Sequence, residues 1–247
     1  FRKGHSPGML VNEVRMHTFT NEQKYGIILL TDLSNAYGST DDRIVLEVLE
    51  KWLNPDVIRM VRSFLVQSTV VVDKHGQRSL PFDTAQQGFG QGSSTSCILF
   101  CLLMRLSHNL DGMEYRNFSY ADDNTILGKS DDFRSVFNGM NISGGHFTSF
   151  CRDGNIKINY KKSHGYPVNT ATRLEMGKGN LELNGIKIST VTKINILGMH
   201  LGDGMSFQPH ISMVDNALRT YKGFLMGVMK YLGTRSLINI TRYMYGK

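Results

Sequence analysis

The alternation of apolar and polar positions predicts a chain of mixed strands and helices. Residues 25–33 (YGIILLTDL) form a short apolar run, which is typical of a buried strand that delivers Asp32 at its edge. Residues 115–120 and 124–127 are strand candidates on either side of an acidic turn, a hairpin signal. Further strands are expected at residues 70–72, 80–82, 156–158, 181–188 and 194–200.

Helical spacing of apolar residues marks other segments. Residues 41–53 form one predicted helix, and Pro55 starts a second that runs towards residue 65. Residues 93–110 contain no Gly or Pro and are apolar on most sides, so we expect a buried helix entered from a glycine-rich stretch, 88–92. A weaker helix, interrupted at Gly144-Gly145, is expected over 133–150. Helical periodicity returns over 211–245, and a small helical subdomain is expected to begin near Gln208.

Composition adds a charge preference to this picture. The chain has 247 residues, of which 40% are hydrophobic, which is enough for one sizeable core. Its 28 Lys and Arg against 21 Asp and Glu give a formal net charge of +7. A polyanionic partner is therefore favoured, although a merely solvated basic surface explains the charge equally well.

The cysteines and the apolar runs point to an intracellular setting. Cys97 and Cys101 stand at helical i, i+4 spacing, and Cys151 stands apart, with no CxxC or His-bearing metal pattern, so reduced thiols are expected. No apolar run approaches the roughly 20 residues that span a bilayer, and no leader resembles a signal peptide. We therefore expect no membrane partner, and nucleus and mitochondrion are not distinguished. The chain begins inside a basic phrase, so we expect it to be a piece of a longer protein.

Three aspartates are the strongest candidate for chemistry. Asp32 and the pair Asp122-Asp123 lie 90 residues apart, but adjacent strands could bring them together. Clustered carboxylates repel one another unless a positive charge lies between them, and Mg²⁺ prefers carboxylate and phosphate oxygens. Two such ions, about 3.5 to 4 Å apart, can activate a 3′-hydroxyl and stabilise a leaving pyrophosphate. The alternative is that the Asp pair is ordinary solvated turn chemistry.

Five phrases carry a family resemblance. They are TDLSNAYGSTDD (31–42), GFGQGSSTSCILF (88–100), YADD (120–123), IKINYKKS (156–163) and ILGMHLGDGMSFQPHI (196–211). They resemble five successive reverse transcriptase motifs in the order of that family. The last phrase and the Gln-Gly-Ser form of the second are most similar to non-LTR (LINE-type) retrotransposon enzymes, with group II intron maturases more distant.

The resemblance implies a polymerase palm, an antiparallel ferredoxin-like sheet backed by helices, with partial fingers over residues 1–207. Residues 208–247 would be a helical segment that starts the thumb or a connection. Asp32, Asp122 and Asp123 would be catalytic and would hold two Mg²⁺ ions, for which Mn²⁺ can substitute, with the Leu33 carbonyl as a further metal ligand.

The same resemblance implies binding roles for further residues. The nucleotide-binding residues would be Tyr37, Gln91, Gly92 and Lys162, with the Tyr37 ring excluding a 2′-hydroxyl. The template-primer contacts would be Arg2, Lys3, Ser93, Tyr120, Leu197 and Gly198. Alternatives remain for three of them: Tyr37 as a core aromatic, Lys162 as a solvated lysine, and Ser93 as a helix N-cap.

Three positions depart from the family pattern, because Gly38 stands where an acidic residue is usual and Gly90 and Cys97 replace usual prolines. The sequence thus favours an RNA-directed DNA polymerase, either a fragment of a longer protein or completed by another chain. Its partners would be an RNA template, a DNA or RNA primer, deoxynucleotides and possible proteins of a ribonucleoprotein. The alternative is a catalytically retired, RNA-binding component of such a particle. An RNA-dependent RNA polymerase is disfavoured by Tyr37.

Overall fold

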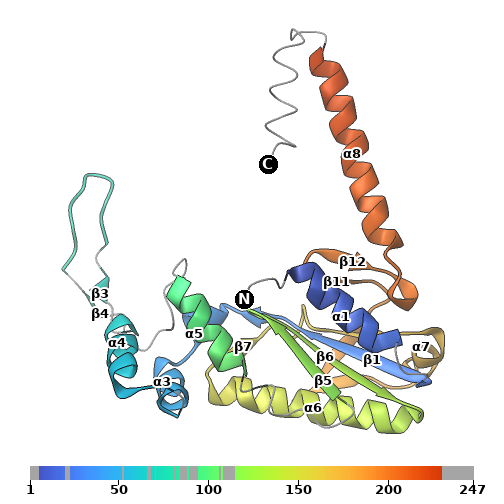
Figure 1. Ribbon diagram of the computed structural model, residues 1–247, viewed down its shortest axis with the longest axis horizontal. Coiled ribbons are helices and arrows are strands. Elements are labelled where there is room, and N and C mark those ends of the chain that lie inside the picture. The colour runs from blue at the N-terminus through green and yellow to red at the C-terminus, as the bar shows by residue number, and fades with distance from the viewer. Residues whose placement is uncertain are drawn as a thin grey trace.

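The computed structural model describes residues 6–19, 23–51, 53–65, 68–69, 71–80, 82–83, 88, 94–105, 107 and 115–229. A six-stranded sheet with the order β5-β6-β1-β8-β10-β9 organises the fold (Figure 1). Its strands are β1 (Tyr25–Thr31), β5 (Tyr115–Tyr120), β6 (Asp123–Ser130), β8 (His164–Pro167), β9 (Leu181–Leu183) and β10 (Ile186–Thr190). All neighbours are antiparallel except β8 and β10, which run parallel.

Helices cover both faces of this sheet. Helix α6 (Phe133–Asp153) lies along one face, and α1 (Pro7–Phe19) lies across the other (Figure 1). Because successive strand residues point to opposite faces, Ile27 and Leu29 of β1 pack in the core on the α6 side, while Ile28 packs with α1 residues. The central strand β1 is therefore buried from both sides.

The remaining elements surround the sheet. Figure 1 shows α8 projecting away from it. The elements are β2 (Leu33–Ser34), which pairs with β7 (Lys157–Ile158), α2 (Ala36–Ser39), α3 (Asp42–Glu50), α4 (Pro55–Leu65), β3 (Ser68–Thr69), which pairs with β4 (Phe82–Asp83), α5 (Ser94–Met104), α7 (Thr170–Met176), β11 (Ile194–Ile196), which pairs with β12 (Met199–Leu201), the 3₁₀ turn η2 (Asp203–Met205) and α8 (Gln208–Met229).

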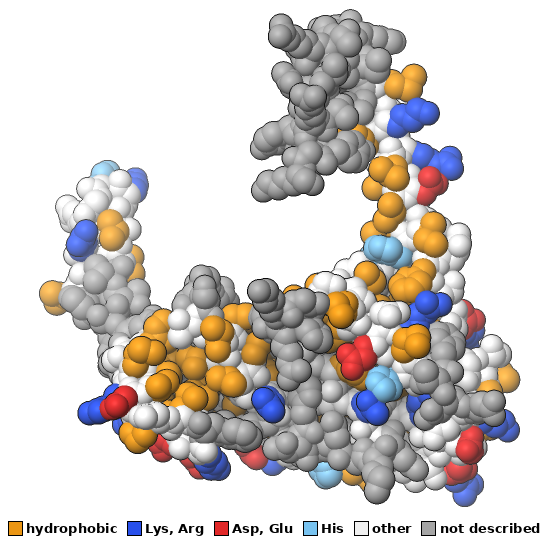
Figure 2. All heavy atoms as spheres, in the orientation of Figure 1, with side chains coloured by type: hydrophobic (Ala, Val, Ile, Leu, Met, Phe, Trp, Pro, Cys, Tyr) orange, Lys and Arg blue, Asp and Glu red, His pale blue; other side chains and the backbone are white. Residues whose placement is uncertain are grey.

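The described residues form the mixed α/β fold that the sequence predicts, with two corrections to helices. Helix α6 runs unbroken through Gly144. A glycine fits this position because a Cβ there would lie 2.7 Å from Leu183 Cδ2. The glycine permits close packing on the sheet and does not interrupt the helix. The expected buried helix, which starts at Ser94 in the described residues, is covered on one side only: Ile98 is 58% exposed. Figure 2 shows hydrophobic side chains gathered at the face that carries α5.

Most strands lie where the sequence predicts them but differ in extent, and strand β8 was not predicted. The run 181–188 is two strands, β9 and β10, joined at Asn184-Gly185, and 194–200 is the hairpin of β11 and β12. The strand expected at 70–72 is reduced to an isolated bridge between Val72 and Arg78 among the residues described there. Within the described ranges, no helix combines the length and hydrophobicity needed to cross a membrane.

Candidate active site

Asp32 lies where β1 ends, and long-range hydrogen bonds fix its backbone. Its N–H donates to Ser163 Oγ at 3.2 Å, and its carbonyl oxygen accepts from the Asn159 N–H at 2.8 Å. Both bonds come from the turn that follows β7, so a segment distant in sequence fixes the backbone at the end of β1. The Asp32 side chain stays 35% exposed.

The second acidic position is the turn between β5 and β6. Tyr120 pairs with Asp123, which leaves Ala121 and Asp122 as a two-residue turn, with Ala121 at a left-handed φ of 53°. Strand β6 also pairs with β1, where Asn124 lies opposite Thr31. Register along the sheet therefore places the acidic turn beside Asp32.

A buried amide holds this arrangement from behind. Asn124 Nδ2 donates to Thr31 Oγ1 at 3.2 Å, and its Oδ1 accepts from Ser119 Oγ at 2.7 Å. The three side chains come from β6, β1 and β5, and Asn124 is almost completely buried. This network joins the strands that present both acidic positions.

The carboxylates influence one another. Partial burial raises the pKa of Asp123, and the negative charges of Asp122 and Asp32 raise it further. Lys162 Nζ lies 4.0 Å from Asp32 Oδ2 with its side chain 71% exposed, so it is a weakly held counter-charge. In the part of the chain that the structure describes, no three His, Cys, Asp or Glu side chains are grouped so that they could hold a metal ion. This end of the sheet, which carries Asp32, Asp122 and Asp123, is the acidic edge, and its negative charges repel one another.

A cavity of about 410 Å³ opens at this edge. Asp32, Asp123 and Lys162 line it together with Leu197, whereas Asp122 is not among its lining residues. Leu197 and Gly198 form the turn between β11 and β12 with φ of 51° and 82°. The cavity therefore combines four of the residues singled out from the sequence.

Tyr37 lies on the other side of the acidic turn. Its hydroxyl donates to Cys97 Sγ at 3.7 Å, and its ring lies 4.9 Å from that of Phe100. Burial and this hydrogen bond raise the pKa of Tyr37, with a smaller effect from the Asp122 charge. Gly88, at φ 83°, packs so closely that a Cβ would lie 2.1 Å from the Tyr37 carbonyl oxygen. Tyr37 is thus both a packed aromatic and a neighbour of the acidic turn.

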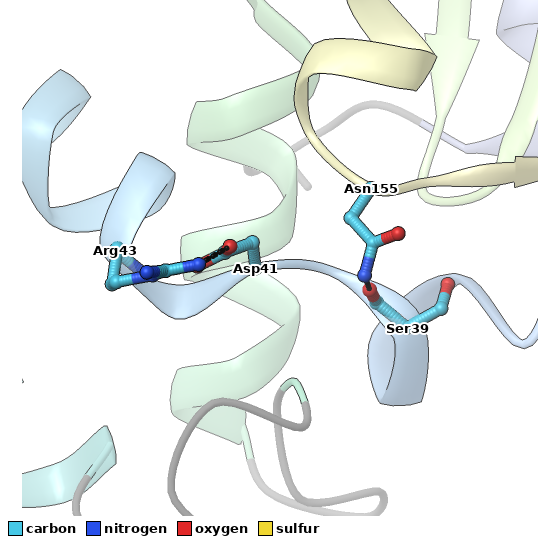
Figure 3. A network of polar contacts seen from close by, with 4 residues as sticks. All are labelled: Ser39, Asp41, Arg43 and Asn155. Carbon is cyan, nitrogen blue, oxygen red and sulfur yellow. Dashed lines mark hydrogen bonds and ion pairs between the residues drawn. The ribbon is translucent and has the colours of Figure 1, made fainter.

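A second polar network anchors the segment that follows Tyr37 (Figure 3). Arg43 donates to both carboxylate oxygens of Asp41, at 3.1 and 2.7 Å, and the hydrogen bonds from Arg43 hold the pKa of Asp41 below its usual value. Asn155 Nδ2 donates to the Ser39 carbonyl oxygen at 3.0 Å. The turn after α6 therefore holds the segment between α2 and α3 in place.

The other sequence-predicted residues have varied positions. Leu33 is buried and pairs with Ile158 in the β2–β7 ladder, and Tyr120 is half-buried at the end of β5. The remaining candidates lie outside the described residues: Arg2, Lys3, Gln91, Gly92 and Ser93.

Sequence reasoning missed several residues at this edge. His164 and Lys193 line the cavity, and Asn124, Asn159 and Ser163 fix its walls. Asn124 was detectable as a polar residue that directly follows the acidic pair and precedes an apolar strand. The other contacts depend on tertiary structure, and the sequence gives no local signal for them.

Comparisons with known proteins identify similar sequences and solved structures with a similar fold. No protein-family model matches the chain. It is 25% identical over 204 residues to the RNA-directed DNA polymerase from mobile element jockey of Drosophila melanogaster, covering 80% of this chain and 22% of that protein. It is 21% identical over 219 residues to the probable RNA-directed DNA polymerase from transposon BS of the same organism, covering 85% and 24%. The chain thus spans less than a quarter of the length of these relatives.

Solved structures share the fold at lower identity. A telomerase from Candida albicans, in complex with the TWJ fragment of telomeric RNA, matches 82% of this chain and 33% of its own, with a TM-score of 0.57 and 15% identity. Apo telomerase from Candida tropicalis matches 81% and 35%, with a TM-score of 0.55 and 12% identity.

Proposed function

We propose that the chain carries the nucleotidyl-transfer site of an RNA-directed DNA polymerase, because it is similar to the polymerases of two mobile elements and shares its fold with telomerases. The observation that carries the proposal is the acidic edge, where strand pairing sets Asp32 beside the Asp122-Asp123 turn. The negative charges of Asp122 and Asp32 also contribute to the raised pKa of Asp123, so the three residues act on one another electrostatically.

Carboxylates suit divalent metal ions of the hard class, although in the described residues Asp32, Asp122 and Asp123 are not grouped as a ready three-ligand site. Mg²⁺ prefers carboxylate oxygens as ligands, and burial, together with the charges of Asp122 and Asp32, raises the pKa of Asp123. Asp32, Asp122 and Asp123 would hold two Mg²⁺ ions, or Mn²⁺, with the Leu33 carbonyl as a further ligand. When bound, such ions activate the attacking hydroxyl and neutralise charge on the leaving pyrophosphate.

The chain's own residues would bind and orient the substrates. Lys162, on the rim of the cavity and 4.0 Å from Asp32, would pair with the triphosphate. The Tyr37 ring would lie beneath the sugar and select deoxynucleotides, held there by Phe100 and by the close approach of Gly88. Gln91 and Gly92 would contact the incoming nucleotide.

Template and primer would lie against the rest of this edge. The β11–β12 turn, Leu197 and Gly198, borders the cavity and would hold the primer strand, with Tyr120 beside the acidic turn. Arg2, Lys3 and Ser93 would contact the template-primer. An RNA template, a DNA or RNA primer and deoxynucleotides are the proposed partners. Since the chain spans under a quarter of its relatives, the rest of the polymerase would come from a longer polypeptide or another chain of a ribonucleoprotein.

Primer extension on an RNA template tests the proposal. The chain, and versions extended by native flanking sequence, are incubated with deoxynucleotides and Mg²⁺ or Mn²⁺, alongside Asp122→Asn and the control Asp153→Asn. Asp153 is a fitting control because its side chain is 72% exposed and does not line the cavity. Extension that survives Asp153→Asn and is lost in Asp122→Asn supports the polymerase. Retained RNA binding without extension by any version would refute it and favour a retired RNA-binding component.

A further inference from the structure

Two basic side chains line the cavity at the acidic edge without an acidic partner. They are His164, in β8, and Lys193, which directly precedes β11. Lys162, the third basic residue of the lining, already lies 4.0 Å from Asp32. In the part of the chain that the structure describes, neither His164 nor Lys193 forms an ion pair. Both are therefore available to a ligand in the cavity.

Strand register places His164 on the same face of the sheet as Asp32. His164 lies opposite Leu30 in the ladder of β1 and β8, and Asp32 follows Leu30 by two residues. Because successive side chains of a strand alternate between faces, these three side chains share one face. Leu30 and Leu197, the latter from the turn between β11 and β12, pack against the same apolar cluster. His164 thus lies on the floor of a cavity whose opposite wall is the β11–β12 hairpin.

A hydrogen bond determines which ring nitrogen of His164 can reach a ligand. Nδ1 lies 2.8 Å from Ser189 Oγ of the neighbouring strand β10. That contact leaves Nε2 as the ring atom without a partner among the described residues. When the Ser189 hydroxyl donates to Nδ1, Nε2 carries the hydrogen and is a donor. A ligand that offers only acceptor atoms selects this tautomer.

The charges around the cavity indicate the class of ligand. Within the described ranges, no three His, Cys, Asp or Glu side chains could hold a metal ion, so His164 does not complete a metal site with Asp32 and Asp123. An imidazole N–H and an ammonium group are donors, which suit phosphate oxygens. The neighbouring carboxylates repel a free anion. A phosphate that belongs to a longer bound strand fits better, because other contacts hold that strand in place.

Lys193 also lines a second cavity, of about 730 Å³, at the base of α8. The helix contributes Gln208, Ser212 and Asn216 to this lining. These uncharged polar residues are four positions apart, so they form one stripe along α8. Side chains of this kind contact phosphate and sugar oxygens in nucleic-acid complexes. Lys193 therefore lies where a strand that leaves the acidic edge towards α8 would pass.

We propose that His164 and Lys193 form a phosphate subsite that binds the last phosphodiester before the 3′ end of the primer strand. His164 Nε2 donates to one non-bridging oxygen, and the Lys193 ammonium group pairs with the negative charge. Together they position the 3′-hydroxyl at the aspartates and take no part in the chemical step. This subsite rests on the proposed polymerase function and specifies what holds the primer end there.

Primer–template duplexes with one methylphosphonate, an uncharged replacement for a phosphodiester, test the subsite. Fluorescence anisotropy with the full chain measures the dissociation constant without turnover. In the wild type, neutralising the last linkage before the 3′ end should weaken binding about tenfold, and neutralising linkages further upstream should weaken it less. Lys193→Ala should weaken binding of the unmodified duplex by a similar factor, and the methylphosphonate at the last linkage should then add little.

Variants at His164 and a matched lysine complete the test. His164→Ala should bind the unmodified duplex more weakly than the wild type, and His164→Gln, which keeps an N–H donor, should recover part of the loss. Lys187→Ala is the control, because Lys187 is an exposed lysine of β10 that lines neither cavity. Circular dichroism confirms that each variant is folded. Equal effects of the methylphosphonate at every linkage, equal binding by Lys187→Ala and Lys193→Ala, or no duplex binding by the chain would overturn the proposal.

Primer extension separates this inference from the polymerase proposal. A loss of affinity confined to the last linkage, without extension by any flanked version, would uphold binding at the subsite and refute the polymerase. Extension that is unaffected by the methylphosphonate and by both alanine variants at limiting primer concentration would uphold the polymerase and refute the subsite.

Discussion

Asp123 stands in an electrostatic environment that opposes its ionised form. Its pKa is raised in the folded chain, so the folded state binds this proton more tightly than the unfolded state. The favourable contribution is complete below the unfolded-state pKa of about 4 and is lost as pH rises through the folded-state pKa. At neutral pH the carboxylate therefore destabilises the fold.

The Asp123→Asn variant should consequently be more stable than the wild type at pH 7. Its advantage should disappear below about pH 4, where the wild-type carboxyl is protonated as well. Thermal unfolding at both pH values measures this, and added Mg²⁺ should stabilise the wild type more than the variant. A lower melting temperature for the variant at pH 7 would contradict this explanation.

Asn124 should stabilise the fold through its hydrogen bonds with Ser119 and Thr31. In Asn124→Ala, Ser119 and Thr31 lose their buried partner, which should cost about 1–3 kcal/mol in the free energy of unfolding. Urea unfolding measures the loss. The comparison variant is Asn117→Ala, which makes the same change at a half-buried position of the same hairpin. Equal stability of Asn124→Ala and the wild type would show that the amide network does not hold the acidic edge.

The sequence predicted those candidate site residues whose charged side chains stand out in a short apolar stretch. The acidic turn and Asp32 are visible because carboxylates interrupt apolar strands. The supports of Asp32 are not, because Asn159 and Ser163 act through a backbone contact that only the folded chain creates. Roles for all of these residues remain predictions.

At the scale of elements, a buried phenol links the sheet to the turn that follows the β11–β12 hairpin. The Tyr166 hydroxyl, in β8, donates to the Gly202 carbonyl oxygen at 2.5 Å and accepts from the Met205 N–H at 3.0 Å. Tyr166 therefore links the central sheet to the turn that precedes α8. This link keeps one wall of the cavity in place.

Tyr166→Phe should leave both backbone groups without this partner in a buried setting. The expected loss is about 1–3 kcal/mol in the free energy of unfolding. Chemical denaturation measures it, and Tyr160→Phe provides a matched change at a half-buried phenol in the turn after β7. If both variants unfold at the same denaturant concentration, the Tyr166 hydroxyl does not join the elements as described.

The local pattern of apolar and polar residues predicted the strongly periodic helices and strands. It did not predict the elements that form only through contacts with distant segments. Strand β8 contains Gly165 and Pro167 and has little apolar content, yet it pairs with β1. At Gly144 the local pattern predicted a break that does not occur. Glycine disfavours helices, but this one lies inside α6 where Leu183 packs closely against it. Tertiary contact decided both cases.

At the scale of the whole molecule, the sheet and its helices present an acidic edge, and helix α8 projects from the β11–β12 side. Figure 1 shows α8 leaving the sheet next to the β11–β12 hairpin that borders the cavity. The net charge of +7 suits a polyanionic ligand. The cavity carries both signs of charge, because Asp32, Asp123, Lys162 and Lys193 all line it.

The central claim is that Asp32, Asp122 and Asp123 act as one site for divalent metal ions. Electron paramagnetic resonance of Mn²⁺ titrated into the chain, with and without a deoxynucleotide triphosphate, measures this without requiring turnover. Mn²⁺ should bind to the wild type and to Asp153→Asn, with binding strengthened by the nucleotide, and binding should fall sharply in Asp32→Asn and Asp122→Asn. Equal Mn²⁺ binding by all four proteins would contradict the account.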